Sequence, residues 1–375
     1  MATLSKVLIV GGSVAGMSCA IQLCKAGIAV DLIDIASDWR SYGAGITITG
    51  PTLRALKTLG VLEQVKALGA VWNGAKVLDQ AGDLLEELSI PPLAPDLPGT
   101  GGIMRPVLHK ILADKTLELG AKVRLGLTVV GLKERDDEVE VQLSDSSRGS
   151  YELVIGADGI FSSMRMLVFP EAPKPQFTGQ VIYRILAERP AGFDRSHFFM
   201  GHGIKAGFNP VSPTHMYMFL LYADPSNPRL DPKDMPQLLH QKMAGFGGFV
   251  PEVRETVLTT NAHTINYRAL DIHILPRPWH RGRVLLIGDA AHSTTPHLAS
   301  GAGLAIEDGI VVADELNRGG ELDEVLSRFT ERRFERCNYV VENSVKLGQI
   351  EMNDGSTAEH GRLMTESLAR LSQPI

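Results

Sequence analysis

The stretch from Lys6 to Asp34, KVLIVGGSVAGMSCAIQLCKAGIAVDLID, decides the fold. The run Lys6–Val10 is apolar, rich in β-branched residues and followed by glycine, which is typical of a buried parallel strand. Ser13–Ala26 follows with the composition of a helix, and Gly27 ends it. Val30–Asp34 is a second strand. Strand, glycine turn, helix and strand in this order predict the opening of a doubly wound α/β sheet.

The turn between the first strand and the helix has the pattern of a phosphate-binding loop. Gly11–Gly16, GGSVAG, approximates G-x-G-x-x-G, with Ser13 in place of the middle glycine. Glycines allow the tight turn and the close approach of helix and strand, and the free N–H groups of the helix start can bind a pyrophosphate. Serine still permits this if its hydroxyl points away. Asp34 ends the second strand, where a carboxylate can accept the ribose hydroxyls and disfavours a 2′-phosphate. The turn therefore predicts FAD or NAD and leaves the two open.

Composition narrows the class of protein. The chain has 375 residues, 44% of them hydrophobic and 21% charged, which suits a globular protein with room for two domains. A net charge of −6 without a cluster of Lys and Arg argues against nucleic-acid binding. The three cysteines, Cys19, Cys24 and Cys337, show no metal-ligand spacing, so we expect reduced thiols, no metal and a cytoplasmic location. We find no signal peptide or long apolar span, and expect no membrane association.

The sequence pattern predicts two interleaved domains. Prolines and aromatic residues become frequent after residue 172, and His215–Leu221, HMYMFLL, suits a mostly antiparallel sheet. Arg283–Ile287, RVLLI, returns to the buried-strand pattern. We assign 1–72, 101–172 and 279–320 to the nucleotide-binding domain, 73–100 and 173–278 to a substrate domain, and 321–375 to C-terminal helices. A loosely packed tail is expected after about Asn353.

Two further motifs select FAD over NAD. Residues 156–165, GADGIFSSMR, follow one buried strand, and 281–292, RGRVLLIGDAAH, contain another. They resemble the DG and GD fingerprints of class A flavoprotein monooxygenases, the para-hydroxybenzoate hydroxylase-like family, and come nearest to the salicylate- and 6-hydroxynicotinate-type hydroxylases. The resemblance covers nearly the whole chain in order. It implies a Rossmann-like FAD-binding domain of the glutathione reductase type, interleaved with an antiparallel substrate domain.

The turn and the resemblance together give a set of expected cofactor residues. Asp289 ends a buried strand and can accept a hydrogen bond from a ribityl hydroxyl, and the helix that begins near Gly301 points its free amides at the flavin. Asp158 is left open between capping its own turn and a role at the cofactor. The residues expected at FAD are Gly11, Ser13, Val14, Ala15, Gly16, Asp34, Ile35, Arg40, Gly45, Ile46, Arg105, Val129, Asp158, Asp289, Pro296, Gly301, Ala302 and Gly303.

The resemblance also implies a reaction. NADH or NADPH visits transiently and reduces FAD, O₂ adds, and a C4a-hydroperoxyflavin hydroxylates an electron-rich ring such as a phenol or hydroxypyridine. Two alternatives stay open: oxygenation of a larger polyketide- or antibiotic-like molecule, as by the tetracycline-inactivating enzymes that share these motifs, and a non-oxygenating flavin reductase. The sequence lacks W-x-W-x-I-P, which argues against a tryptophan-type halogenase. A non-enzymatic flavin sensor is disfavoured by the intact motif residues.

Candidate catalytic residues come from both domains. His297 follows a proline beside the flavin helix, as in the salicylate- and 6-hydroxynicotinate-type enzymes, and is the first candidate to contact substrate or flavin; the alternative is an ordinary loop histidine. Tyr217 and His202 are further catalytic candidates, against the alternatives of sheet packing and a solvated turn.

Thr47 and Tyr183, together with His297, are expected at the substrate. Thr47 stands where 6-hydroxynicotinate hydroxylases carry a histidine, a departure that leaves the substrate undecided. Arg184 is undecided between a substrate carboxylate and a surface pair. We expect a small aromatic substrate and a monomer or homodimer.

Overall fold

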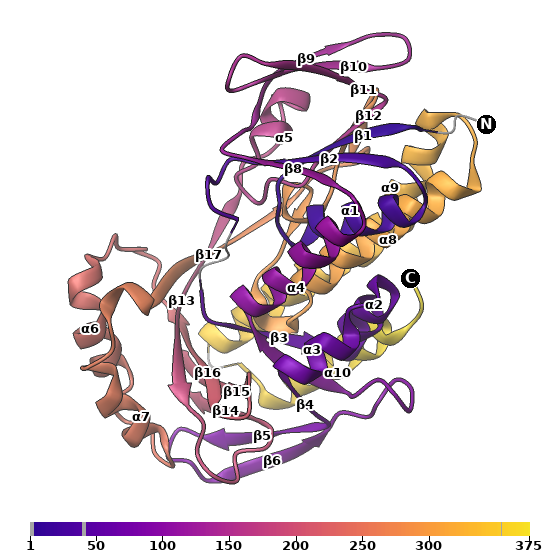
Figure 1. Ribbon diagram of the computed structural model, residues 1–375. Helices are drawn as coiled ribbons and strands as arrows, with labels where there is room; N and C mark the ends of the chain where they lie inside the picture. The colour runs from indigo at the N-terminus through magenta and orange to yellow at the C-terminus, as the bar shows by residue number, and fades with distance from the viewer. Residues whose placement is uncertain (1–3, 40–42, 354) are drawn as a thin grey trace.

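A parallel sheet forms the nucleotide-binding half of the protein, drawn at the top of Figure 1. The computed structural model describes residues 4–39, 43–353 and 355–375. The sheet has the order β18-β19-β12-β1-β2-β8, and every neighbouring pair except β18 with β19 is parallel. Its strands are β1 (Lys6–Val10), β2 (Ala29–Asp34), β8 (Lys122–Leu125), β12 (Leu153–Gly156), β18 (His280–Arg281) and β19 (Val284–Leu286). The doubly wound sheet expected from the sequence is confirmed.

Helices pack on this sheet, and a small antiparallel sheet lies at one end of it (Figure 1). The helices are α1 (Val14–Lys25), α4 (Arg105–Glu118), α5 (Ser163–Val168), α8 (Gly301–Arg318) and α9 (Leu322–Met352). The small sheet consists of β9 (Val129–Glu134), β10 (Val139–Leu143) and β11 (Arg148–Tyr151). α8 packs most closely on α1, where a Cβ on Gly309 would lie only 2.6 Å from the backbone nitrogen of Cys19.

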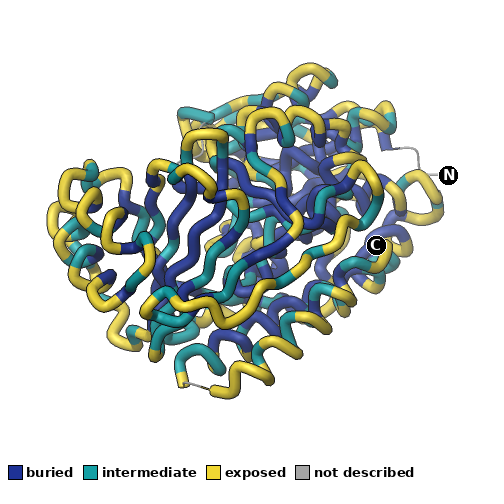
Figure 2. Tube along the Cα trace, turned by 90° about the horizontal axis from the view of Figure 1, so that it is seen from below, coloured by how far each residue is buried: buried dark blue, intermediate teal, exposed yellow. Residues whose placement is uncertain are grey.

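An eight-stranded, mostly antiparallel sheet forms the second half. Its order is β20-β17-β13-β16-β15-β14-β5-β6, so strands from four regions of the chain meet in it. Its members are β5 (Gly74–Asp79), β6 (Leu84–Ser89), β13 (Gln176–Glu188), β14 (Ser196–Gly201), β15 (Ile204–Pro210), β16 (His215–Ala223), β17 (Asn266–Ile274) and β20 (His292–Ser293). One face packs on α6 (Met235–Lys242) and α7 (Val250–Val257). Figure 2 shows its central strands buried and the outer segments exposed.

A third sheet joins the halves, and a last helix closes the chain. The joining sheet has the order β3-β7-β4, made of β3 (Gly45–Thr49), β7 (Thr100–Met104) and β4 (Ala70–Trp72), next to α2 (Gly50–Leu59) and α3 (Leu62–Leu68). Four short 3₁₀ turns are η1 (Pro232–Asp234), η2 (Ala262–Thr264), η3 (Gly288–Ala290) and η4 (Pro296–Leu298). The expected loose tail is wrong, because α10 (Thr357–Ser372) buries Ser367 and Leu371 against the rest of the chain.

The described residues include no helix long and apolar enough to cross a membrane.

Two helical glycines give a matched test of the packing. Gly309→Ala places a methyl group against the α1 backbone and should destabilise the protein by about 1–3 kcal/mol. Gly361→Ala, in α10, meets nothing within 4 Å and should stabilise it by about 0.5–1 kcal/mol through helix propensity. Urea unfolding of both variants measures the two changes. Equal effects would contradict the close α1–α8 contact.

Candidate cofactor and active site

The glycine-rich turn is shaped by backbone contacts that only glycine allows. Gly11 has a φ of +113°, and a Cβ there would lie 2.3 Å from the carbonyl oxygen of Ala157. A Cβ on Gly16 would lie 1.9 Å from the carbonyl oxygen of Gly11. The Ser13 hydroxyl donates to the Ala157 carbonyl at 3.2 Å, and it does not cap the helix. The N–H groups at the start of α1, around Val14, are therefore left for an anionic ligand.

Asp34 holds this turn in place. Its carboxylate accepts hydrogen bonds from the backbone N–H groups of Gly12, at 2.6 Å, and Ala36, at 2.7 Å. The next residue, Ile35, has 74% of its surface exposed, which suits an apolar contact for a nucleotide base. Arg40 lies outside the described residues.

The sequence reasoning missed a second support of the same turn. Trp39 donates from its indole nitrogen to the Gly12 carbonyl at 2.9 Å, and the His109 ring lies 3.2 Å from the same oxygen. The two rings meet edge to face. Burial lowers the pKa of His109, so its neutral imidazole can donate to this carbonyl. His109 follows Arg105 by one helical turn, and only that i, i+4 spacing could have indicated it.

Asp158 caps helix α5. Its two carboxylate oxygens accept from the hydroxyls of Ser162 and Ser163 and from the backbone N–H of Met164. Arg165, at the end of the same motif, donates to the Ala290 carbonyl at 2.8 Å and so ties the DG motif to the GD motif. The capping role that was left open is present, and contact of Asp158 with a cofactor stays a prediction.

Asp289 and Arg105 face the same interior space. Both residues are exposed to solvent although protein surrounds them, the pattern of side chains that line an open cavity. That enclosure raises the pKa of Asp289, and Arg105 and His292 partly offset the rise. Arg105 has a lowered pKa because of burial and the nearby Arg184. The cavity therefore offers one acceptor and one cation at the carboxyl ends of the parallel strands, where such folds bind ligands.

A buried ion-pair network fixes the segment that carries Asp289. Asp308, in α8, accepts from the Gly288 backbone N–H at 2.8 Å and pairs with His292 Nε2 at 2.6 Å. Its other oxygen accepts from Arg333 Nε at 2.7 Å, and Arg333 also donates to Glu307 at 2.8 Å. Each of these side chains is at most 2% exposed. The GD motif is thus anchored through α8 to α9.

Three members or neighbours of this network are residue types that could bind a metal ion. His292, Asp308 and Cys337 place ligand atoms within 4.8 Å of one another. The guanidinium of Arg333 lies 2.7 Å from Asp308 and 3.6 Å from Cys337 Sγ. Arg333 is therefore the cation that balances this site.

Gly45 lies where two sheets meet. A Cβ on Gly45 would lie 2.5 Å from the Cβ of Tyr217, so β3 approaches β16 directly at this point. Arg184 donates to the Tyr217 hydroxyl at 3.1 Å and has no carboxylate partner among the described residues. Ile46 and Thr47 follow Gly45 in β3, and both are partly exposed. The structure brings Tyr217 and Arg184 to the side of the cavity that holds Arg105.

The remaining residues expected at FAD lie either near the start of α8 or in the core of the nucleotide-binding half. Pro296 opens η4, and Gly301 and Ala302, at the start of α8, are partly exposed. Gly303 is packed so closely that a Cβ would lie 2.2 Å from the hydroxyl oxygen of Thr52. Val129 is 2% exposed at the start of β9, inside the core of the nucleotide-binding half.

His297 does not face the cavity. Its side chain has 0% exposed surface, its Nδ1 lies 2.8 Å from the Thr295 hydroxyl, and its Nε2 lies 3.4 Å from Glu351. A side chain with no accessible surface cannot touch a flavin or a substrate in this arrangement. The expected direct contact is therefore corrected to a buried position. We call residues 295–300 the flavin loop, because they lead into the helix expected at the flavin.

Two other candidates also lie away from the cavity. Tyr183 is buried on the opposite face of the sheet, where its ring contacts Tyr222 and Tyr267 and packs toward α6 and α7. Strand alternation places it opposite to Arg184, so we do not retain it as a substrate contact. His202 is exposed in the turn between β14 and β15. Tyr217 pairs with Asn209 near the other end of β15, so the two side chains lie apart along the sheet.

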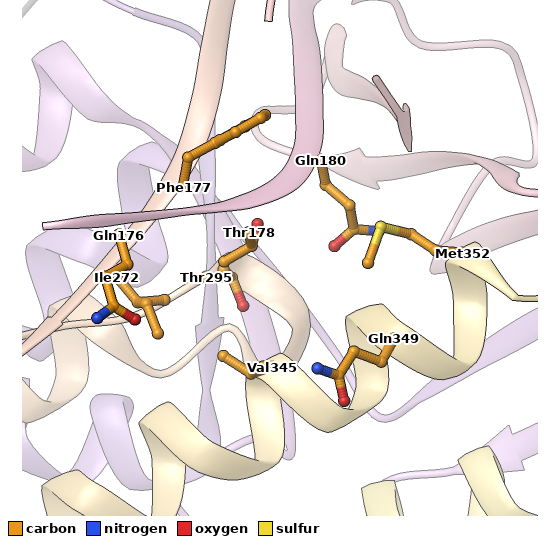
Figure 3. A pocket seen from close by; sticks show the side chains of 9 residues that line it. All are labelled: Gln176, Phe177, Thr178, Gln180, Ile272, Thr295, Val345, Gln349 and Met352. Carbon is orange, nitrogen blue, oxygen red and sulfur yellow. The ribbon is translucent and has the colours of Figure 1, made fainter. Parts of the chain in front are cut away.

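A small cavity of about 220 Å³ lies beside α9, separate from the site at Asp289. Figure 3 shows the side chains of Gln180, Thr295 and Gln349 around it. It contains none of the expected cofactor residues, and Thr295 connects its wall to His297.

Comparison with known proteins places this geometry in a family. The family model described as "FAD binding domain" matches residues 5–344. Aurachin C monooxygenase/isomerase of Stigmatella aurantiaca is 32% identical over 92% of this chain and 89% of its own length. The 2-heptyl-3-hydroxy-4(1H)-quinolone synthase of Pseudomonas aeruginosa is 33% identical over the same shares. The Klebsiella pneumoniae HpxO structure with FAD and uric acid shares the fold, with a TM-score of 0.85 at 24% identity over 99% of this chain and 93% of its own.

The fold and site thus define an FAD-dependent oxidoreductase. The chain belongs to the FAD-binding domain family, and within it to the FAD-dependent monooxygenases of the class A type. The residues described above fit that cofactor. The glycine-rich turn has no room for a side chain at two positions, the N–H groups at the start of α1 are available to a pyrophosphate, and Asp289 and Arg105 are exposed at the same site.

Asp289→Ala should weaken FAD binding without unfolding the protein. Loss of a hydrogen bond to a charged group costs about 1.5–3 kcal/mol, which is roughly 10- to 100-fold in Kd. Titration of apoprotein with FAD, followed by flavin fluorescence, measures the change. The control is Asp314→Ala, a half-exposed carboxylate elsewhere on the protein. Unchanged FAD affinity in Asp289→Ala would remove this residue from the site.

The His292–Asp308 pair predicts a pH dependence of stability. Despite burial, Cys337 and Asp308 raise the pKa of His292 well above 6.5. A raised pKa in the folded state stabilises the protein fully below pH 6.5, and this contribution is lost as pH rises through the raised value. His292→Gln retains a donor but no titratable charge. Urea unfolding between pH 6 and 9 should show a steeper alkaline loss in the wild type than in the variant, and parallel curves would contradict the ion pair.

Proposed function

We propose that the protein hydroxylates an aromatic or heteroaromatic ring, using NADH or NADPH and O₂, and that it acts in the cytoplasm as a monomer or homodimer. Two relatives support the substrate class. FAD-dependent urate hydroxylase of Klebsiella oxytoca is 28% identical, and 3-amino-4-hydroxybenzoate 2-monooxygenase of Streptomyces cremeus is 30% identical. Both names describe oxygen transfer to a ring.

The observation that carries the proposal is an apolar strip with one polar end on the flavin-facing side of the large sheet. Ile182, Leu221 and Leu270 form a buried cluster there, and Phe219 packs against it. Directly paired residues of an antiparallel sheet share a face, so Arg184 lies on this face opposite Phe219. A flat ring can pack on the partly exposed Phe219, and a ring oxygen can reach the Arg184–Tyr217 end.

Phe219 presents its ring to this space because of a glycine on the neighbouring strand. A Cβ on Gly207 would lie 2.1 Å from the Phe219 ring, so the ring lies directly over the β15 backbone. The ring is partly exposed and lies 5.9 Å from that of Tyr217. Phe219 is therefore placed to contact an aromatic substrate.

These residues suggest distinct roles. Bound FAD supplies the oxygen-transfer chemistry, and the protein binds and orients the ring and excludes water. Arg184, with no carboxylate partner among the described residues, can stabilise a ring oxygen as its anion, and Tyr217 can hydrogen-bond to it. An ionised ring oxygen makes the ring a better nucleophile. Thr47, by its position after Gly45, is retained as a candidate for substrate contact, and catalysis by His202 is less favoured by its exposed turn.

A screen of phenols, hydroxypyridines and quinolones for stimulation of NADH and NADPH oxidation tests the function. We expect at least one compound to stimulate oxidation and to give a product with one added oxygen. The same assay without substrate, and with ring analogues that lack the hydroxyl or lactam oxygen, serves as the control. Product formation that is independent of O₂ would overturn the proposal.

Gly207→Ala tests the substrate face without touching the predicted FAD contacts. The added methyl group must displace the Phe219 ring, so KM for the stimulating compound should rise, by about tenfold if one ring contact is lost. FAD affinity should remain within about twofold. An unchanged KM would show that Phe219 does not contact substrate.

A further inference from the structure

One buried carboxylate connects four parts of the chain behind the flavin loop. Glu351, near the end of α9, pairs with Lys205 Nζ of β15, and its side chain is 6% exposed. The same oxygen lies 2.9 Å from His360 Nε2 of α10, and the other oxygen lies 3.4 Å from His297 Nε2 of η4. The cluster Lys205–His297–Glu351–His360 is separate from the Asp308 network.

Two members of this cluster belong to the two halves of the protein that the proposed reaction brings together. His297 belongs to the segment that runs into Gly301 at the start of α8, the expected flavin edge. Lys205 pairs with Leu221 in the sheet, so it shares the flavin-facing side with the apolar strip. Glu351 therefore holds the flavin loop and the substrate sheet to a common point.

The electrostatics keep this carboxylate ionised. Burial by itself opposes the charge, but Lys205 holds the pKa of Glu351 well below its usual range. Burial lowers the pKa of His297, and Glu351 only partly offsets this, so its imidazole is neutral at neutral pH. His297 Nε2 lies 3.4 Å from Glu351 without hydrogen-bond geometry, while Nδ1 lies 2.8 Å from the Thr295 hydroxyl. The negative charge beside Nε2 favours the tautomer of His297 that carries its proton on that atom.

A second buried carboxylate shows what a purely structural role looks like. Glu315, in α8, is 1% exposed and binds Arg318, Arg328 and Arg332, all from α8 or α9. It ties two helices together and touches no residue of the flavin loop or the substrate sheet. It provides a matched control for loss of a buried negative charge.

From this geometry we infer that Glu351 is a positioning residue for oxygen transfer. Glu351 contacts the loop 295–300 through His297 and strand β15 through Lys205. The distance between this loop and this strand sets where the substrate ring lies relative to the flavin. This inference rests on the proposed hydroxylation. Because neither His297 nor Glu351 reaches the cavity, the effect is on alignment, and misalignment of reacting groups by about 1 Å lowers the rate of transfer strongly.

The test compares Glu351→Gln, Glu351→Asp and Glu315→Gln in the full-length, FAD-loaded protein. Glu351→Gln should lower the product formed per NAD(P)H oxidised by about three- to tenfold, with peroxide released instead and KM changed by less than about twofold. Glu351→Asp should recover part of the coupling. Glu315→Gln should lower the melting temperature but leave coupling unchanged. Full coupling in Glu351→Gln would overturn the inference.

A second readout does not depend on the reaction. Hydrogen exchange of the amides of residues 295–300 should accelerate in Glu351→Gln, with and without FAD, and should not change in Glu315→Gln. If no compound supports hydroxylation by the wild type, the proposed function fails while this measurement still decides the positioning role. Thr295→Val removes the hydrogen bond between the Thr295 hydroxyl and His297 with little change in volume, and serves if Glu351→Gln does not fold. Unchanged exchange in both variants would overturn the inference.

Discussion

The carboxylate of Asp308 is the group on which the cofactor site depends. It binds the backbone of Gly288, the ring of His292 and the guanidinium of Arg333, and none of these groups is accessible to water. Removal of one partner from such a buried pair costs about 3–5 kcal/mol, because the other charge is left without compensation. Asp289 is adjacent to Gly288, so the position of its carboxylate in the cavity follows from this anchor. The glycine-rich turn is held separately, by Asp34, Trp39 and His109.

Local sequence predicted the parts of the protein whose geometry is local. The run from Lys6 to Asp34 predicted two strands and a helix because apolar periodicity and glycine positions are decided within a few residues. The orientation of the Ser13 hydroxyl is also local: it points away from the start of α1, as a pyrophosphate site there requires. The two fingerprints containing Asp158 and Asp289 then indicated FAD, and the family comparison confirms that assignment.

The misplaced residues depend on contacts far apart in the sequence. The place of His297 just before the flavin helix predicts a contact with the cavity, but its ring faces Glu351 of α9, 54 residues later. Tyr183 lies on the far side of its sheet because pairing with β16 and β17 sets which face of β13 meets the other half. The glycine that allows the position of the Phe219 ring is on another strand. The helix after Asn353 is stabilised by packing on α9. Such partners cannot be read from local patterns.

The two halves of the protein meet where Arg105 lies near Asp289 on one side and near Arg184 and Tyr217 on the other. Close contact of Gly45 with Tyr217 brings them together, and Glu351 ties them at the far end. The central claim is that this cavity transfers one atom of O₂ to an aromatic ring. Mass spectrometry of the product formed under ¹⁸O₂ tests it most directly. The account predicts one ¹⁸O atom in each product molecule and none from H₂¹⁸O, whereas a product with oxygen from water, or with no added oxygen, would contradict it.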